Sequence, residues 1–255
     1  MLTNSSNTLN VTMGDNWVRG DLNTIRMHIP TTNNGIGADL VFKSAAPPTR
    51  FGGSGLFYFD PSLTRISGVI DPMPHALVSG NLTYDGKVHQ VNGTGFQDKQ
   101  WGTVSWNQEY DGWYWSSGHY GNYTEDMFKQ FTSPVFGSQP TQDFYLARGN
   151  GPSKVLVETM KGLTTIASGS IPGPGGHTYP KVLTFQWKNG SNSATLTLTE
   201  PKLIFSTTDA INTNATIYGT PEYQRLFGKG TLNVQWNGTN ETASAPAIWE
   251  VSYTH

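Results

Sequence analysis

Short segments in which apolar and polar residues alternate recur along the whole chain. Residues 17–29 (WVRGDLNTIRMHI) and 230–236 (GTLNVQW) follow this pattern over much of their length, and most such segments end at Gly, Pro, Asn or Asp. Alternation with a period of two places one set of side chains on each face of a β-strand. The 29 Gly and 15 Pro among 255 residues supply frequent turn positions. The sequence therefore predicts an all-β protein built from many short strands.

Two dipeptides predict tight hairpin turns between such strands. Asp85-Gly86 and Asn189-Gly190 each lie between strand-like segments, and pairs of this kind supply the positive φ angles of a type I′ turn. Helical periodicity is weak. Its best case is residues 220–227 (TPEYQRLF), whose Thr-Pro start suits a helix N-terminus. We therefore expect one short helix in that segment.

A stretch rich in Pro, Gly and small polar residues predicts a domain boundary. Pro134, Gly137 and Pro140 interrupt residues 131–142 (FTSPVFGSQPTQ). We interpret residues 133–141 as a linker. It divides the chain into a β-sandwich or lipocalin-like domain at 1–132 and a lipocalin-like β-barrel domain at 142–255.

Charge and cysteine content exclude several classes of protein. Charged residues make up 13% of the chain and its net charge is −2, so no basic surface for nucleic acid is predicted. No apolar stretch approaches the roughly 18 residues that cross a bilayer, so membrane insertion is not predicted. The chain has no cysteine, and its six histidines show no metal-ligand spacing. We therefore expect no disulfide, no metal site and no cofactor, and the sequence leaves the oligomeric state open.

The chain is dense in sequons for N-glycosylation. This density has two interpretations, a consequence of the abundant Ser and Thr or passage through a secretory pathway with glycans on the surface. We expect a secreted or secretory-pathway protein, although the polar segment after Met1 carries no visible signal peptide. The sequon asparagines are Asn4, Asn10, Asn81, Asn92, Asn122, Asn189, Asn214, Asn237 and Asn240.

Aromatic side chains concentrate in residues 93–124. Trp101, Trp106, Trp113 and Trp115 lie within fifteen positions of this segment. Aromatic walls with a few convergent polar groups are typical of a pocket for an apolar ligand. The same rings are equally consistent with a buried aromatic core. Composition alone does not decide between pocket and core.

Four segments of the chain resemble, in order, the carotenoid 1,2-hydratase/AttH-like family, which includes fungal natural-product Diels–Alderases. Residues 93–102 (GTGFQDKQWG) resemble the family motif GxGYHDHxWG, and residues 36–42 (IGADLVF) resemble a family strand. Residues 72–82 (PMPHALVSGNL) and 113–124 (WYWSSGHYGNYT) resemble two further elements. The resemblance implies a two-domain calycin-like fold, a β-sandwich plus a lipocalin-like β-barrel, with a pocket for a hydrophobic small molecule. It also implies that part of the family's usual chain lies ahead of Met1.

The chain departs from the family motif where a hydratase needs its histidines. Gln97-Asp98-Lys99 stands in place of His-Asp-His, which argues against hydration because protonating an alkene needs a general acid. A cycloaddition needs mainly confinement of the reacting groups and a few polarising donors. We expect Asp98, Lys99 and Tyr114 to polarise the substrate. The expected substrate-binding residues are Gln97, Trp101, Trp113, Trp115, His119 and Tyr120.

The resemblance, the aromatic segment and the missing histidines together favour a biosynthetic cyclase. This would be a Diels–Alderase or hetero-Diels–Alderase acting without a cofactor on a polyketide or terpenoid intermediate, with the hetero-Diels–Alderase branch of the family as one candidate. One alternative is a non-catalytic lipocalin-like carrier with the same pocket. Another is a secreted carbohydrate-active or lectin-like protein that uses Asp98, Glu109 and Asp111.

Overall fold

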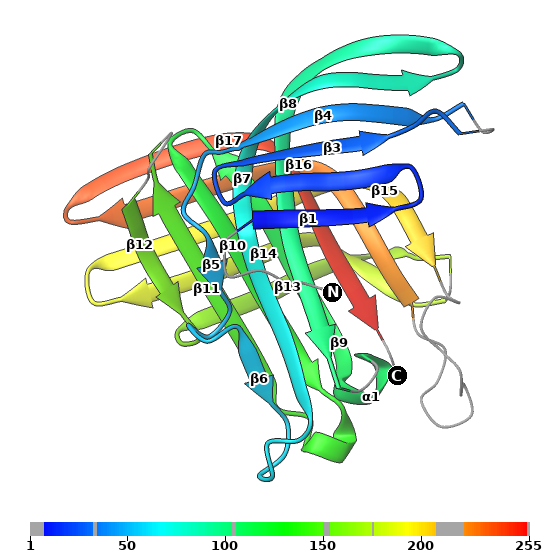
Figure 1. Ribbon diagram of the computed structural model, residues 1–255. Coiled ribbons are helices and arrows are strands. Elements are labelled where there is room, and N and C mark those ends of the chain that lie inside the picture. Colours follow the sequence, from blue (N-terminus) through cyan, green and yellow to red (C-terminus); the bar gives the residue numbers. More distant parts are fainter. Residues whose placement is uncertain are drawn as a thin grey trace.

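The computed structural model describes residues 8–32, 35–103, 106–149, 154–174, 176–207 and 222–253, and these residues are nearly all in β-strands (Figure 1). Within them the helices are a single four-residue turn, α1 (Trp106–Glu109), and the 3₁₀ turn η1 (Pro134–Phe136). Neither has the length and hydropathy that a membrane-spanning helix requires. The all-β, two-part calycin-like fold expected from the sequence is confirmed.

The N-terminal sheet has eight antiparallel strands in the order β1-β2-β3-β4-β7-β5, and β6 and β8 also pair with β7. Its two long strands, β7 and β8, form one hairpin that runs past the other strands (Figure 1). The strands are β1 (Thr8–Met13), β2 (Asn16–Asp21), β3 (Thr24–Ile29), β4 (Gly37–Ser44), β5 (Thr49–Arg50), β6 (Leu56–Tyr58), β7 (Ile66–Tyr84) and β8 (Lys87–Gly102).

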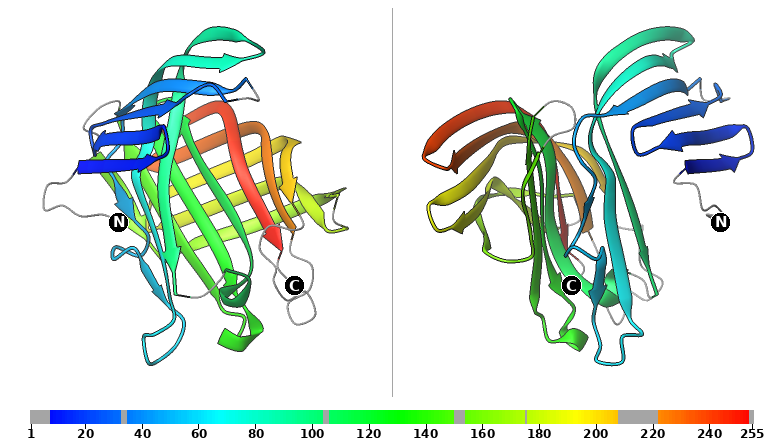
Figure 2. Two further views of the ribbon diagram at one scale, coloured as in Figure 1. Left: turned by 45° about the vertical axis from the view of Figure 1, so that its right-hand side comes forward. Right: turned by 60° about the vertical axis from the view of Figure 1, so that its left-hand side comes forward.

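The C-terminal sheet has nine antiparallel strands in the order β12-β11-β10-β9-β17-β16-β15-β14-β13. It curls on itself, and β7 and β8 run along the outer side of its green strands (Figure 2). The strands are β9 (Tyr110–Tyr120), β10 (Tyr123–Thr132), β11 (Pro140–Arg148), β12 (Lys154–Thr159), β13 (Leu163–Pro172), β14 (Thr178–Asn189), β15 (Asn192–Thr207), β16 (Glu222–Trp236) and β17 (Thr239–Tyr253).

The segment interpreted as a linker, 133–141, lies inside the C-terminal sheet. It connects β10 to β11, which pair directly with Phe131 opposite Pro140. The turn contains η1 and closes at Gly137, whose φ of 84° suits glycine. The chain passes from one sheet to the other earlier, between β8 and β9. The division into units that fold independently stays a prediction.

Both hairpins predicted from the sequence form, but only one has its turn at the predicted residues. Asp85 and Gly86 adopt φ angles of 50° and 69° between β7 and β8, so this hairpin prediction is confirmed. The second hairpin also forms, although its turn lies one residue later than predicted, because Asn189 already pairs with Asn192.

The helix predicted over 220–227 is wrong for the residues that the structure describes. From Glu222 onward they form β16, paired with both β15 and β17. Their inward side chains alternate, with Glu222, Gln224 and Leu226 fully buried. Pairing on both sides of the strand outweighs the local helix signal.

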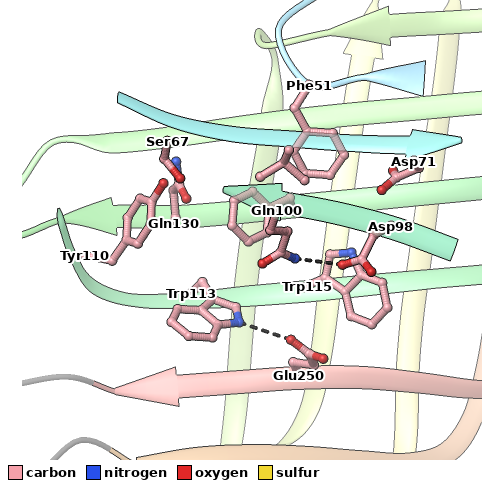
Figure 3. Close-up of a pocket in the computed structure, with 12 residues that line it drawn as sticks. Phe51, Ser67, Asp71, Asp98, Gln100, Tyr110, Trp113, Trp115, Gln130 and Glu250 are labelled. Atoms are coloured by element: carbon pink, nitrogen blue, oxygen red, sulfur yellow. Dashed lines mark hydrogen bonds between the residues drawn. The ribbon is translucent and has the colours of Figure 1, made fainter. Parts of the chain in front are cut away.

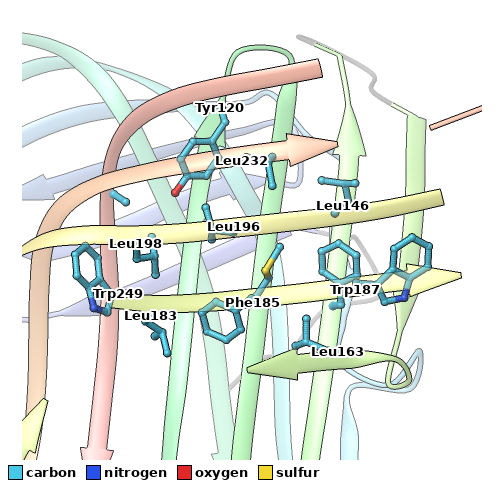
Figure 4. Packing of buried hydrophobic residues seen from close by; sticks show 14 of the residues in the cluster. Tyr120, Leu146, Leu163, Leu183, Phe185, Trp187, Leu196, Leu198, Leu232 and Trp249 are labelled. Atoms are coloured by element: carbon cyan, nitrogen blue, oxygen red, sulfur yellow. The ribbon is translucent and has the colours of Figure 1, made fainter. Parts of the chain in front are cut away.

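The interior of the curled sheet is a packed apolar core to which every one of its strands contributes (Figure 4). Trp249, Phe185 and Leu196 are fully buried there. Tyr120 lies among them, and its ring packs against Gly230 of β16, where a Cβ atom would come within 2.3 Å of the hydroxyl oxygen. This interior is therefore filled by the protein's own side chains.

Hydrogen bonds and an aromatic contact join the two sheets. The Tyr145 hydroxyl donates to the backbone oxygen of Pro47 at 2.7 Å, and the Gly52 amide donates to Asp143 at 2.8 Å. Phe51 packs against Phe128 of β10 with ring centroids 5.5 Å apart. These contacts hold the chain on either side of β5 against the outer face of the C-terminal sheet.

The sequon asparagines that the structure describes are all exposed: Asn10, Asn81, Asn92, Asn122, Asn189, Asn237 and Asn240. Asn4 and Asn214 lie outside the described residues. Glycosylation and secretion stay predictions.

Candidate functional site

A narrow cavity of about 30 Å³ lies between the two sheets (Figure 3). We call it the carboxyl cavity. Its walls come from β7 and β8 on one side and from β9, β10 and β17 on the other. The lining residues are Phe51, Ser67, Val69, Asp71, Asp98, Gln100, Tyr110, Trp113, Trp115, Phe128, Gln130 and Glu250.

Strand alternation explains why these side chains meet. Ser67, Val69 and Asp71 are alternate residues of β7, and Asp98 and Gln100 are alternate residues of β8. Val69 pairs with Gln100 in the hairpin, so the two sets share one face. That face is turned toward the C-terminal sheet.

Two tryptophans of β9 form the opposite wall. The Trp113 indole donates to the Glu250 carboxylate at 3.3 Å, which fixes the ring (Figure 3). Glu250 also accepts hydrogen bonds from the Tyr223 hydroxyl at 2.5 Å and from Arg225 at 2.6 Å. Trp115 forms the other end of this wall, and its ring lies 5.3 Å from that of Phe96 on β8, measured between centroids. A guest molecule in this cavity would therefore meet two aromatic surfaces held in place.

Two carboxyl groups enter the cavity from the N-terminal sheet. Asp98 is exposed at the mouth and accepts a hydrogen bond from the Gln100 amide at 2.8 Å. Burial of its carboxyl against the wall raises its pKa above the usual value. Asp71 lies deeper and is 1% exposed. Burial, followed by the charges of Asp98 and Asp143, raises the pKa of Asp71 well above the usual value.

Two further carboxyl groups lie behind Asp71 on the C-terminal sheet. Asp126 of β10 is fully buried, and burial followed by the charge of Asp71 raises its pKa well above the usual value. Burial raises the pKa of Asp143 on β11 to about 7, although the Gly52 amide opposes the shift. Mutual repulsion among buried carboxylates is relieved when protons are retained. This cluster therefore holds protons at neutral pH.

A fifth acidic group lies beside Ser67, which lines the cavity. Glu109 is fully buried at the end of α1, and burial raises its pKa to about 8, partly offset by the Ser67 hydroxyl. Burial also raises the pKa of the neighbouring Tyr110. The carboxyl cavity thus combines aromatic walls with two carboxyl groups of raised pKa, Asp71 and Asp98, a combination suited to hydrogen-bond donation and proton transfer.

Three residues proposed from the motif lie on the other face of β8. Gln97, Lys99 and Trp101 alternate with Asp98 and Gln100, so they point away from the carboxyl cavity. The Trp101 ring lies over Gly68 on the outer surface and is 36% exposed. Lys99 is exposed on the same face.

The proposed residues of β9 divide in the same way. Tyr114 packs against the interior core of the curled sheet, and Tyr120 is fully buried within it. His119 points toward the N-terminal sheet, as Trp113 and Trp115 do, but lines a different pocket. The structure therefore brings together Asp98, Trp113 and Trp115 out of the nine proposed residues.

The sequence motifs did not indicate that Asp71, Asp126, Gln100 or Glu250 belongs to the site. A signal was present for the two aspartates, because each is an acidic residue in a strand next to apolar residues (VIDPM and TEDMF). No local pattern marks Glu250, which reaches the site through the pairing of β17 with β9. Among the described residues, no three His, Asp or Glu side chains gather as metal ligands.

No family model matches the chain. A region of 98 residues is 31% identical to the quinolone epoxide rearrangement protein penF of Penicillium thymicola, and it covers 38% of this chain and 27% of penF. The match thus spans about a quarter of the relative's length.

Solved structures resemble the chain over almost its whole length. Kievitone hydratase from Nectria haematococca has a TM-score of 0.62 at 19% identity, covering 97% of this chain and 71% of that one. A putative AttH from Nitrosomonas europaea has a TM-score of 0.59 at 15% identity, covering 96% and 70%. CghA, solved with Sch210972, has a TM-score of 0.66 at 11% identity, covering 96% and 69%. The resemblance predicted from the sequence motifs is confirmed, and the chain has the fold of the AttH-like proteins.

Proposed function

We propose that this chain is a natural-product biosynthetic enzyme that closes a ring in a hydrophobic polyketide or terpenoid intermediate, by a Diels–Alder or hetero-Diels–Alder reaction in the carboxyl cavity. One observation carries the proposal. Trp113 and Trp115 wall a cavity into which Asp98 and Asp71 direct carboxyl groups of raised pKa.

Confinement is the first contribution of the protein. The indoles of Trp113 and Trp115 and the ring of Phe128 bound the cavity on the side of the C-terminal sheet. The cavity of about 30 Å³ must widen to admit a polyene, which requires the two walls to separate. Once held between them, a flexible polyene adopts fewer conformations, so part of the entropic barrier to cyclisation is removed before reaction. Cycloaddition redistributes bonds within the substrate and needs no external electron or proton, so the proposal requires no cofactor.

Hydrogen-bond donation is the second contribution. The raised pKa of Asp98 favours its protonated form, and in that form the carboxyl donates to a carbonyl of the dienophile or to the oxygen of a quinone methide. Such a bond strengthens as charge develops in the transition state. Asp71, behind Asp98, raises the cost of ionising that cluster because its own charge would repel its neighbours.

The relatives support an assignment to small-molecule tailoring chemistry. The name of penF states that it rearranges a quinolone epoxide, and a second protein of similar fold is a kievitone hydratase. Both names describe chemistry on small oxygenated molecules. A ring closure assisted by an acidic side chain is likewise a reaction of a small oxygenated molecule.

The two alternatives receive less support from the site. A carrier would release its ligand unchanged and gives no role to buried acids of raised pKa. A carbohydrate-active or lectin-like protein would use Asp98, Glu109 and Asp111, of which Asp98 alone lines the carboxyl cavity. We therefore favour the enzyme.

The test is a turnover assay with the purified full chain. One substrate set is linear polyenes that carry an enone dienophile, and the other is an ortho-quinone methide precursor with an alkene partner. We expect faster product formation and enrichment of one diastereomer over the buffer control. Rates and product ratios equal to the buffer control in both sets would contradict the proposal. Ligand recovered unchanged in stoichiometric amount would identify a carrier.

A further inference from the structure

A second pocket lies between the sheets, next to the carboxyl cavity. Phe96 of β8 lines it and contacts Trp115 of the carboxyl cavity, with ring centroids 5.3 Å apart. The pocket measures about 360 Å³. His75 of β7 and His119 of β9 form its polar part, and Pro246 and Ile248 are among its apolar walls. We call it the histidine pocket.

His75 is buried without a hydrogen-bond partner. Its side chain is 4% exposed, and neither ring nitrogen has a partner among the described residues. Buried polar groups in proteins almost always have a partner, because leaving one without costs the full desolvation of that group. Both nitrogens are also closed to solvent, so a ligand in the pocket supplies the missing bond only when the His75 ring turns toward it.

The two imidazoles stack and are both neutral at neutral pH. Their ring centroids are 4.0 Å apart and their planes lie at 16°. Burial, followed by the neighbouring His119, lowers the pKa of His75 to about 4, and burial lowers the pKa of His119. A neutral imidazole has one N–H donor and one bare nitrogen acceptor. The His75 ring can therefore accept a hydrogen bond from a ligand, whereas Nδ1 of His119 already lies 3.3 Å from the Thr124 hydroxyl.

The rest of the histidine pocket disfavours a charged ligand. None of its lining residues is Lys, Arg, Asp or Glu. Taking an ion out of water into such surroundings is costly when no opposite charge meets it. Phenols and enols fit better, since they join an apolar body to a hydroxyl group that is a strong hydrogen-bond donor.

We propose that the histidine pocket binds a neutral phenol or enol, whose hydroxyl donates to the bare nitrogen of His75 while its apolar body packs against Phe96 and Ile248. This site is separate from the carboxyl cavity. The proposal goes beyond the ring-closing function and does not depend on it, because binding alone is claimed.

The test compares two probes that differ by one hydroxyl group. 2-Naphthol and naphthalene are titrated into the full chain at pH 7.5, and binding is followed by the fluorescence of each probe. We expect 2-naphthol to bind about tenfold more tightly than naphthalene, the preference expected of one buried hydrogen bond. Equal affinities for the two probes would overturn the proposal.

Two variants locate the bound probe. His75→Phe keeps an aromatic ring beside His119 and removes both nitrogens, so the tenfold preference for 2-naphthol is expected to disappear. Asp98→Asn alters only the carboxyl cavity and is expected to keep the preference. A preference that survives His75→Phe, or that is lost in Asp98→Asn, would place the probe elsewhere and overturn the proposal.

A measurement on the unaltered protein guards against a variant that fails to fold. With ¹⁵N-labelled histidine, we expect 2-naphthol to shift the ring nitrogen signals of His75 and His119, while signals of the distant His177 stay in place. Saturating probe without a shift at His75 would equally overturn the proposal.

Discussion

The interior of the curled sheet and the space between the two sheets share strand β9 but contain different kinds of side chain. Toward the interior, β9 directs Tyr120 into a core of leucines and aromatic rings that every strand of the sheet fills. Toward the N-terminal sheet, the same strand directs Trp113, Trp115 and His119 at buried aspartates and a buried histidine. The first region is mostly apolar, whereas the second gathers titratable side chains, among them Asp71 and His75. We infer that the interior provides stability and that the space between the sheets provides chemistry.

The interior also holds two buried carboxyl groups, Glu125 on β10 and Glu222 on β16, and each has a hydrogen-bond partner. The Ser116 hydroxyl donates to Glu125 at 3.1 Å, and the His177 amide donates to Glu222 at 3.2 Å. Burial raises the pKa of Glu125 well above the usual value. The space between the sheets instead holds a cluster of aspartates, in which neighbouring charges help to raise the pKa of Asp71 and of Asp126.

The largest expected effect is on the interior. Trp249→Ala empties a site that is 1% exposed and is expected to lower the free energy of unfolding by about 3–5 kcal/mol. The matched control is Trp101→Ala, which removes the same ring from the outer surface and is expected to cost less than about 1.5 kcal/mol. Urea unfolding measures both. Equal losses would mean that the interior is not the main source of stability.

The next effect concerns the acids between the sheets and depends on pH. The pKa of Asp143 rises from 3.8 to about 7 on folding, so the folded state holds a proton that the unfolded state has released. The stability that this proton confers is complete below pH 4 and is lost as the pH rises through 7. The shift corresponds to roughly 4 kcal/mol.

Asp143→Asn removes this titration and keeps an oxygen that can accept from Gly52. We expect the free energy of unfolding of the variant to fall less than that of the wild type between pH 4 and pH 8. Urea unfolding at a series of pH values gives the two profiles. If they run parallel, Asp143 is not held protonated by the fold.

A smaller effect is expected at the mouth of the carboxyl cavity. Asp98→Asn replaces a carboxylic acid by a weaker donor of the same shape, so the rate of ring closure is expected to fall about tenfold with little change in stability. Lys99→Met changes the adjacent residue on the exposed face of β8, and it is expected to leave the rate unchanged. The turnover assay measures both. A larger loss in Lys99→Met would restore the assignment made from the sequence motif.

The β class and the hairpin at Asp85-Gly86 could be predicted because alternation and turn chemistry are local properties. The arrangement of the sheets could not. Strand β9 lies beside β17, with Trp113 opposite Ser252, and no local pattern links residues so far apart in the chain. The helix expected near residue 222 failed for the same reason, since β15 and β17 determine the structure there.

The candidate site shows the same limit at the level of single side chains. The motif located the segment around Asp98, and alternation placed Trp113 and Trp115 on one face. Neither indicated which face meets the N-terminal sheet. Lys99 and Tyr114 were therefore grouped with residues that point the other way.

Adjacent residues of β9 allow the most direct test of the division between interior and site. Trp115 lines the carboxyl cavity, and its neighbour Tyr114 packs against the interior core. The measurement is the diastereomer ratio formed by the folded fraction of Trp115→Ala and of Tyr114→Ala. We predict that Trp115→Ala moves the ratio toward that of the buffer control, while Tyr114→Ala lowers stability and keeps the wild-type ratio. A wild-type ratio in Trp115→Ala together with a lost ratio in Tyr114→Ala would contradict the account, because it would place the chemistry inside the curled sheet.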